Sequence, residues 1–333
     1  MPLDADPPRL TLPLVGGGHQ DLATDLDLIN EETLATAKTA VWFERDGVLL
    51  NAGILWTVRA DIGANTLELA GEGPHSYWRR RNIRQNVTHT AVDQLTIAKS
   101  LIDTAQAVPN GTIGVVVSSV LSGYGRNRVW KAYERKNLGE ALEQLGNLNY
   151  GFDWRYDTNY VGGIPTSTLQ FTYPATGRVT AHVFEVGTNC SMLTYEEDGS
   201  AIANTVDALG AGEGDDALIV TVANAPMIGG GYPILEDVTS FGDVREFNAL
   251  EDHARRRLAR GAGPIRRVAL DTFPDVEPTL GSYVIGDQVR VVADHGRVQL
   301  SDLMRIVEMT VTVSGGSEAI NLSLAGIESF GFT

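Results

Sequence analysis

The chain has 333 residues, 43% of them hydrophobic, which allows two or three domains with a substantial core. No apolar run approaches the roughly 20 residues of a membrane span, and the first residues lack the basic and apolar stretches of a signal peptide, so we expect neither a membrane span nor Sec-type export. With 42 acidic and 26 basic residues the formal charge is −16, which disfavours specific binding of nucleic acid.

The N-terminal part of the chain predicts a loop-rich segment followed by short strands. Residues 1–40 have a mixed composition, and the run PLVGGG within them is typical of a loop. From residue 41 the runs VWFER, LLNAGILWTVR and TLELAG predict three strands, with turn residues at Asp46-Gly47 and at Gly63 between them.

One hairpin pattern occurs near both ends of the chain, at residues 54–73 and 304–328. Each copy has a strand that alternates every second residue, a turn, and a return strand that ends in L-x-L-A-G. In the first copy Ile54, Trp56 and Val58 are predicted to share one face of the strand. A duplicated β-unit suggests two similar building blocks of a symmetric assembly, whereas chance convergence of two ordinary hairpins would give the same pattern.

Helices are predicted mainly between the two hairpins. Their starts are marked by capping residues at Thr90 to Asp93, at Asn137 with Glu140, and at Asp243 with Glu246. The aromatic and polar residues of FDWRY (152–156) and LQFTY (169–173) alternate, which predicts a hairpin across a Gly-rich loop.

The predicted fold class is α+β and β-rich, because strands and helices do not alternate regularly enough for a doubly wound parallel sheet. We expect two similar β-barrel-like modules with an inserted mixed α/β region. The predicted parts are an N-terminal segment (1–40), a first β-barrel module (41–90), an inserted α+β region (91–264) and a second β-barrel module (265–333).

The sequence contains no recognisable motif for catalysis, a cofactor or a metal. Glycines 210, 212 and 214 lead into Asp215-Asp216 and a strand-like run instead of a helix, which indicates a β-turn and not a phosphate loop. The acidic groups at 196–198 and 215–216 lack calcium-loop spacing and are typical of solvated turns. Cys190, the single cysteine, is expected to be a small buried hydrophobe.

Catalysis is not predicted either. The six histidines are scattered, there is no G-x-S-x-G elbow, and no pair among the 42 acids stands out as a glycosidase pair. We therefore expect a protein that is not an enzyme and that holds no cofactor and no metal.

Two sets of residues are candidates for binding. The first set is a predicted protein interface, because arginine pairs well with carboxylates of a neighbouring subunit; it consists of Trp78, Arg79, Arg80, Arg81, Asp287 and Arg290. For the basic run at 78–84, the only concentrated positive charge, a small nucleic-acid site and a solvated turn are the alternatives. For Asp287 a Gly-Asp turn that bonds its own backbone is an equally good interpretation. The second set is a candidate carbohydrate contact, Trp154, Tyr156 and Tyr160, although the alternation of this hairpin places most of its aromatic rings in the core.

Three stretches together make the sequence similar to a known family. They are ILWTVRADIGANTLELAGEGPHSYWRRRNI, VGTNCSMLTYEEDGSAIANTVDALGAGEGDD, and a C-terminal succession of an Arg-rich helix, a proline, a strand, GSYVIGDQVRVV and LMRIVEMTVTVSGGSEAINLSLAGI. Over roughly residues 40–330 the chain resembles the hub, or minor tail, proteins of siphophages that infect actinobacteria. These proteins are related to the baseplate hub and to the N-terminal part of tail-associated lysins.

The resemblance implies a structural virion protein of the tail tip, made in the host cytoplasm. Hubs of this kind have two similar β-barrel domains per chain, and three chains form a ring that joins the tail tube to receptor-binding or fibre components and lets DNA pass. The implied partners are the chain itself as a homotrimer, the distal tail protein, the tape measure protein and tail fibre or receptor-binding proteins. An acidic lumen would repel the DNA during ejection.

The sequence also departs from the family, because many relatives continue into fibre-like or lytic extensions, whereas this sequence ends at SFGFT. Receptor binding and cell-wall cleavage are therefore expected of other tail proteins. The alternative function is a carbohydrate-binding module that contacts the host cell envelope, and a third is a glycan or peptidoglycan hydrolase.

Overall fold

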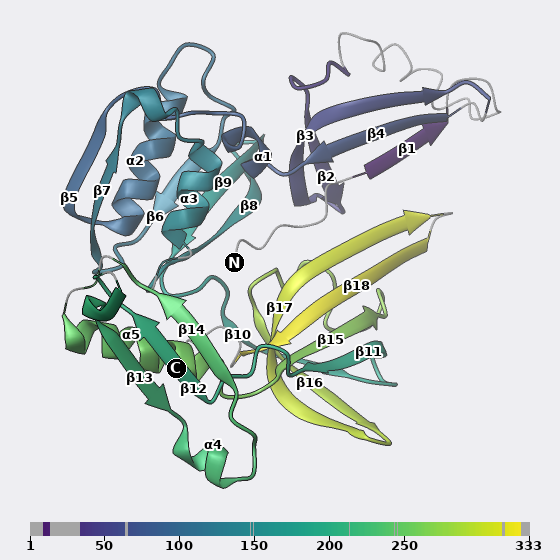
Figure 1. Cartoon of the computed structure of the whole chain (residues 1–333). Helices are drawn as coiled ribbons and strands as arrows, with labels where there is room; N and C mark the ends of the chain where they lie inside the picture. The colour runs from purple at the N-terminus through teal and green to yellow at the C-terminus, as the bar shows by residue number, and fades with distance from the viewer. Residues whose placement is uncertain are drawn as a thin grey trace. The chain divides into compact units, whose positions relative to one another are not determined.

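The computed structural model describes residues 9–13, 34–63, 66–146, 148, 150–212, 214–242, 244, 246–314 and 317–327. The chain folds into two compact units, Met1–Thr176 and Gly177–Thr333, called unit 1 and unit 2 (Figure 1). Within the described ranges no helix has both the length and the apolar character to cross a membrane.

Unit 1 begins with a four-stranded antiparallel sheet in the order β1-β4-β3-β2. Its strands are β1 (Arg9–Pro13), β2 (Ala40–Arg45), β3 (Val48–Asp61) and β4 (Thr66–Glu72). The Asp46-Gly47 turn has positive φ at both residues, as a tight two-residue hairpin requires, which confirms the predicted turn. The first half of β3 pairs with β2 and the second half with β4. Buried Leu55, Leu67 and Leu69 form a small core.

The remainder of unit 1 is a mixed α/β region. Its strands are β5 (Val87–Asp93), β6 (Val116–Ser119), β7 (Gly125–Trp130), β8 (Asp153–Val161) and β9 (Ile164–Thr172). Its helices are α1 (His75–Trp78), α2 (Gln94–Gln106) and α3 (Leu138–Gly146), with a 3₁₀ turn, η2, at Ala132–Glu134. The strands form two sheets, β5-β7 and β6-β9-β8. Antiparallel pairing of β8 and β9 across Gly162-Gly163 confirms the predicted aromatic hairpin.

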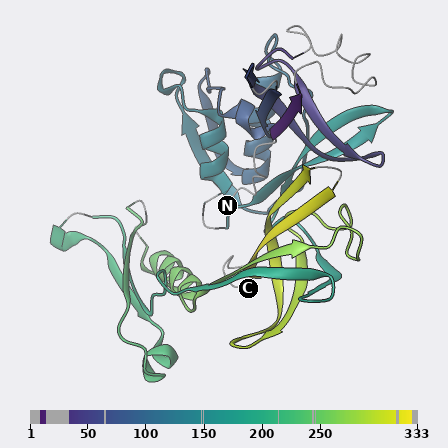
Figure 2. The same ribbon diagram turned by 90° about the vertical axis from the view of Figure 1, so that its right-hand side faces the viewer.

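Unit 2 contains a six-stranded sheet in the order β10-β16-β17-β18-β15-β11. The strands are β10 (Val179–Glu185), β11 (Cys190–Asp198), β15 (Ile265–Thr272), β16 (Gln288–His295), β17 (Val298–Ser314) and β18 (Ser317–Gly326). The long hairpin of β17 and β18 is the yellow ribbon of Figure 2. It confirms that the second hairpin pattern folds as an antiparallel pair.

A second, smaller part of unit 2 packs one helix against a three-stranded sheet. The sheet has the order β13-β12-β14, with β12 (Thr205–Leu209), β13 (Ile219–Ala223) and β14 (Glu236–Ser240). The helices of this part are η3 (Gly214–Asp216), α4 (Ala225–Gly229) and α5 (Phe247–Arg260). Leu250 and Ala254 of α5 are fully buried against this sheet. Gly214 opens η3, a short 3₁₀ helix where the sequence predicts a β-turn, and β13 follows it.

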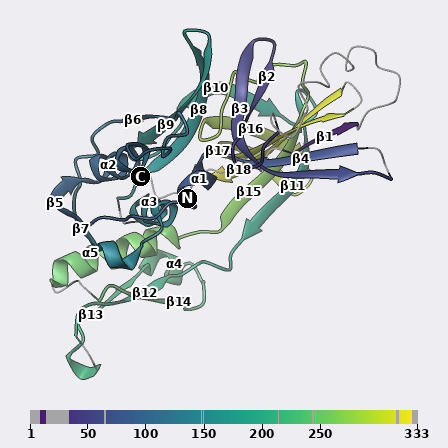
Figure 3. The same ribbon diagram turned by 90° about the horizontal axis from the view of Figure 1, so that it is seen from above.

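The two hairpin patterns belong to a larger structural repeat. The order β1-β4-β3-β2 in unit 1 matches β15-β18-β17-β16 in unit 2, and all six pairings are antiparallel. The registers also correspond: β1 pairs Arg9 with Ala70, and β15 pairs Arg267 with Ala325, where each alanine is that of L-x-L-A-G. Both long middle strands also contain an irregularity, at Trp56 and at Val307. Figure 3 shows β1, β4 and β3 side by side.

The β-barrel expectation is not met by these sheets. The fold is β-rich and α+β, but among the described residues no sheet closes on itself. Closure would require the two outer strands of a sheet to pair with each other. In the four-stranded sheet the outer strands are β1 and β2, and in the six-stranded sheet they are β10 and β11; neither couple forms a strand pair. A single bridge joins Val186, directly after β10, to Cys190 at the start of β11.

The helix starts were predicted with mixed success. Residues 90–93 lie in β5, and Asp93 itself caps α2, so the start at Thr90 is wrong by one turn. The Asn137 side chain accepts a bond from the Glu140 N–H at 3.1 Å, which confirms the start of α3. The α5 helix follows Glu246, which makes no side-chain cap bond, and Asp243 lies outside the described residues.

Candidate interaction surface

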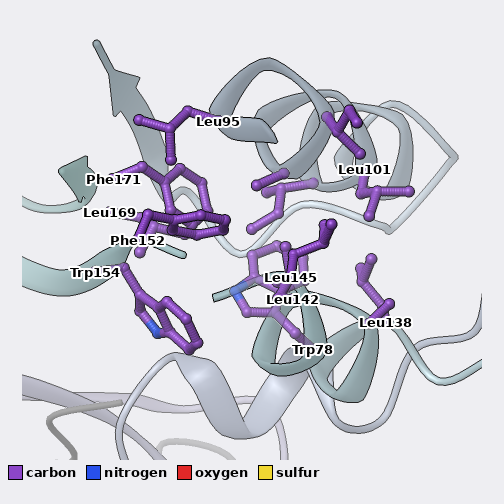
Figure 4. Packing of buried hydrophobic residues seen from close by; sticks show 14 of the residues in the cluster. Trp78, Leu95, Leu101, Leu138, Leu142, Leu145, Phe152, Trp154, Leu169 and Phe171 are labelled. Atoms are coloured by element: carbon purple, nitrogen blue, oxygen red, sulfur yellow. The ribbon is translucent and has the colours of Figure 1, made fainter. Parts of the chain in front are cut away.

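The indole of Trp78 is buried in the core of unit 1. Its ring is 0% exposed, and its Nε1–H donates to the Tyr156 hydroxyl at 2.8 Å. Figure 4 shows it between leucines of α3 and the aromatic residues of β8 and β9. Trp78 therefore holds α1 against the core and is not accessible to a partner, which corrects its assignment to an interface.

Arg79 and Arg80, which follow α1, make contacts inside unit 1. Arg79 Nε donates to Glu143 Oε1 at 3.0 Å, and His75 Nε2 lies 3.1 Å from the same oxygen. Burial raises the pKa of Glu143, but the bonds from Arg79 and His75 outweigh it and leave the pKa below its usual value. The Arg80 guanidinium lies 4.8 Å from the centre of the Trp56 ring, which joins β3 to the end of α1.

Arg81 caps the C-terminal end of α2. Its guanidinium donates to the carbonyl of Ala105 at 2.9 Å and of Gly111 at 3.0 Å, and it also bonds the Tyr77 hydroxyl. The last carbonyls of a helix have no partner within the helix, so a cation at this place satisfies them. The basic run therefore has a structural role at Arg81, while Arg79 and Arg80 remain exposed as well as bonded.

Asp287 is an internal anchor of unit 2. It is 1% exposed, and its carboxylate accepts bonds from the N–H groups of Arg178 at 3.0 Å and Val284 at 3.3 Å. This geometry agrees with the interpretation as a turn that bonds its own backbone. Arg290 is exposed on β16 and donates to the Ser301 carbonyl of the neighbouring strand at 3.0 Å.

The rings considered for carbohydrate do not form one exposed surface. Trp154 is only 5% exposed, and Tyr156 is partly buried where its hydroxyl meets Trp78. Tyr160 is 44% exposed near the tip of β8, and its hydroxyl is bonded to Glu44. Two of the three side chains are thus core residues, as the alternation of the hairpin indicates.

A groove of about 900 Å³ opens in unit 1 beside Tyr77 and Arg81. One side is formed by the continuous segment 81–89 and the other by α2 together with the loop that follows it. Cations and amides line it, and none of its lining residues is a carboxylate. Among the described residues, the buried Nε2 atom of His89 has no hydrogen-bond partner.

The charge of the surrounding sequence was a signal that could have pointed to this groove. Residues 73–137 contain ten basic and three acidic side chains, a net charge of +7, in a chain whose formal charge is −16. Only the run at 78–84 is concentrated positive charge in the sequence, and the other basic residues are spaced out along the chain. Of the ten basic residues, Arg81 and Arg84 line the groove.

Metal binding finds no support in the described part of the chain, where no cluster of histidine, cysteine and carboxylate side chains could hold an ion. Cys190 is fully buried, and burial raises the pKa of its thiol to about 11. This agrees with its predicted role as a buried hydrophobe.

No protein-family model matches the chain, and no curated protein sequence does so either. Solved structures are similar in fold. The 43 kDa tail protein of prophage MuSo2 from Shewanella oneidensis has a TM-score of 0.63 at 10% identity, with 97% of this chain and 90% of that chain covered. A tail protein from Neisseria meningitidis MC58 has a TM-score of 0.57 at 15% identity, covering 86% and 83%.

A third similar structure is the E. coli c3393 protein, described as a component of the type VI secretion system with structural similarity to the T4 bacteriophage tail proteins gp27 and gp5. Its TM-score is 0.51 at 11% identity, and the match covers 89% of this chain and 65% of that chain. At these identities the likeness concerns the fold. The chain has the fold of phage tail proteins.

Proposed function

We propose that this chain is a structural protein of a phage tail. The observation that carries the proposal is the similarity to the MuSo2 tail protein, which extends over 97% of the chain and therefore includes both units. The proposal assigns no catalytic step to the chain and no cofactor.

Within the tail, we propose the position of a hub at the tip, in a homotrimeric ring between the tail tube and the receptor-binding or fibre components. The distal tail protein and the tape measure protein would be its other neighbours, and the virion tail tip its location. The repeated four-stranded unit supports this proposal, because three chains with two similar units each would present six similar units around one axis.

The charge distribution fits the passage of DNA through such a ring. Residues 177–333 carry 23 acidic and 11 basic side chains. If this part lines the lumen, it repels the phosphates of DNA during ejection. The segments 41–90 and 265–333, each with one copy of the repeated hairpin, are the proposed ring-forming modules, and 1–40 and 91–264 the parts around them.

Electron microscopy of the purified chain at high concentration, classified without imposed symmetry, tests the proposal. We expect closed rings with threefold symmetry, six lobes and an open centre, and a particle mass three times 35.8 kDa by mass photometry. A closed particle with another symmetry, or an elongated particle without two similar lobes per chain, would contradict the hub. Dilution should dissociate the rings into monomers with unchanged secondary structure by circular dichroism.

A further inference from the structure

We propose that the groove between residues 81–89 and helix α2 binds an extended, acidic peptide segment of another protein, which adds a strand to the free edge of β5. The proposal concerns a surface of unit 1 and does not depend on whether three chains form a ring. It rests on the shape of the groove, on the open strand edge and on the charge around it.

The first observation is that the groove follows a backbone edge. All nine residues from Arg81 to His89 line it. Side chains of an extended segment alternate between two faces, so a groove on one face would be lined by every second residue only. Residues 81–86 precede the strand, whereas Val87, Thr88 and His89 belong to β5. Because these three consecutive strand residues all line the groove, it runs along the edge of β5, where backbone N–H and C=O groups lie.

The second observation is that this edge has no strand beside it. Strand β5 pairs with β7 in a two-stranded sheet, and no other described strand pairs with β5. In an antiparallel pair every second residue directs its backbone groups away from its partner strand. An extended peptide satisfies such groups with its own backbone, whereas a saccharide has no matching row of N–H and C=O groups.

The opposite wall determines which side chains fit. Ser100, Leu101, Thr104 and Ala105 of α2 line it at helical spacing, and Val108 continues it. Leu101 is buried, and Ala105 is packed against the hydrophobic core. This wall suits small apolar side chains on one face of an added strand, with roughly five residues of the peptide along the groove.

Charge determines the other face of the peptide. Arg84 is exposed, and its guanidinium makes no hydrogen bond or ion pair with the described residues. The lining contains two arginines, Arg81 and Arg84, and no carboxylate. Together these features favour a peptide that alternates acidic and small apolar residues.

Fluorescence anisotropy with the full chain tests the proposal directly. The probes are labelled seven-residue peptides that alternate valine with glutamate, and a matched peptide that alternates valine with lysine. We expect the acidic peptide to bind at least about tenfold more tightly than the basic one. A peptide with N-methyl groups on alternate amides should lose binding in one register and keep it in the other, because only one set of amides faces β5.

Two matched pairs of variants locate the site. Arg84→Glu should weaken binding by about tenfold or more, whereas Lys38→Glu changes the net charge equally at an exposed place outside the groove and should leave binding unchanged. Thr104→Trp fills the groove and should also weaken binding, whereas Thr96→Trp, an exposed residue of the same helix that does not line the groove, should not. All four sites are exposed, so each variant should keep the circular dichroism spectrum of the parent chain.

Several results would overturn the proposal. They are equal binding of the acidic and basic peptides, insensitivity to N-methylation in both registers, or equal effects of Arg84→Glu and Lys38→Glu. Self-association that Arg84→Glu abolishes in the absence of peptide would show that the groove takes a second copy of this chain instead. Competition of an acidic oligosaccharide for the groove, with no peptide binding, would show a glycan site.

Discussion

Asp93 joins two segments of unit 1 through one carboxylate, and its removal should destabilise both. One oxygen, Oδ1, accepts from the N–H groups of Leu95 at 2.9 Å and Thr96 at 3.4 Å, at the start of α2. The other, Oδ2, accepts from the N–H of Ser122 at 2.9 Å, from its hydroxyl at 2.8 Å and from the N–H of Gly123 at 2.9 Å. The Asp93→Ala variant loses the helix cap and the anchor of the 122–123 loop together.

The expected loss is about 3 kcal/mol in the free energy of unfolding. Replacing a capping residue by alanine costs about 1 kcal/mol. Hydrogen bonds to a charged group contribute roughly 1.5–3 kcal/mol each, and since the carboxylate is partly exposed we take about 2 kcal/mol for the whole loop contact. Asp93→Asn keeps one acceptor oxygen for the cap and should lose about 1–2 kcal/mol.

Urea denaturation followed by tryptophan fluorescence measures these losses. All five tryptophans lie in unit 1, so their emission reports the unfolding of that unit alone. The control is Thr90→Ala, at the residue where the sequence predicts the helix start. Thr90 is exposed in β5, so the change should cost less than about 1 kcal/mol. If Thr90→Ala destabilises unit 1 as much as Asp93→Ala does, the assignment of the cap is wrong.

The same contacts predict how the effect depends on pH. Burial raises the pKa of Asp93, but the hydrogen bonds from Ser122, Leu95, Gly123 and Thr96 outweigh it and hold the pKa below its usual value. A carboxyl whose pKa is lowered by folding contributes stability at pH values above its unfolded-state pKa of about 3.9. This contribution is lost as the pH falls through the pKa of the folded state. The difference between parent and Asp93→Asn should therefore be constant above about pH 5 and shrink below about pH 4.

Three further substitutions or modifications give separate tests. Trp78→Phe removes the N–H that bonds Tyr156 and leaves a small void, so it should lower the free energy of unfolding by about 2 kcal/mol and shift the urea midpoint to a lower concentration. An unchanged midpoint would contradict the burial of the Trp78 ring. Glu143→Gln removes a partly exposed ion pair with Arg79, so it should lower the free energy of unfolding by no more than about 1 kcal/mol near pH 7. The loss should become smaller as the pH falls through the lowered pKa of Glu143, and a loss that grows in acid would refute the lowered pKa. The Cys190 thiol, buried and with its pKa raised to about 11, should not react with a disulfide reagent at pH 8 in the native protein and should react in urea; a rapid native reaction would show that it is accessible.

Local sequence patterns were sufficient where neighbouring residues decide the structure. The Asp46-Gly47 turn requires positive φ values that these residues tolerate, and the cap at Asn137 bonds a group only three residues away. The β8–β9 hairpin follows from alternation on either side of two glycines. Each of these is a short-range preference of the backbone, so no distant contact is needed to specify it.

The sequence did not show which side chains the tertiary structure would cover. Trp78 stands next to three arginines, which suggests a surface, yet α3 and β8 bury its ring completely. The Asp93 carboxylate that caps α2 also accepts bonds from Ser122, whose loop reaches Asp93 only in the folded unit. The groove beside residues 81–89 needs α2 as its second wall, and no pattern within one segment predicts it.

The sequence by itself determined that two similar β-hairpins exist and where their turns lie, because period-two alternation and turn residues act within a few positions. Only the tertiary structure decided that each hairpin belongs to a repeated four-stranded unit and that the described sheets stay open. Strand order depends on the pairing of β1 with β4 and of β15 with β18, in which the paired residues lie 48 to 61 positions apart in sequence. Such pairing reflects the burial of both partners at once, a property that neither segment carries alone.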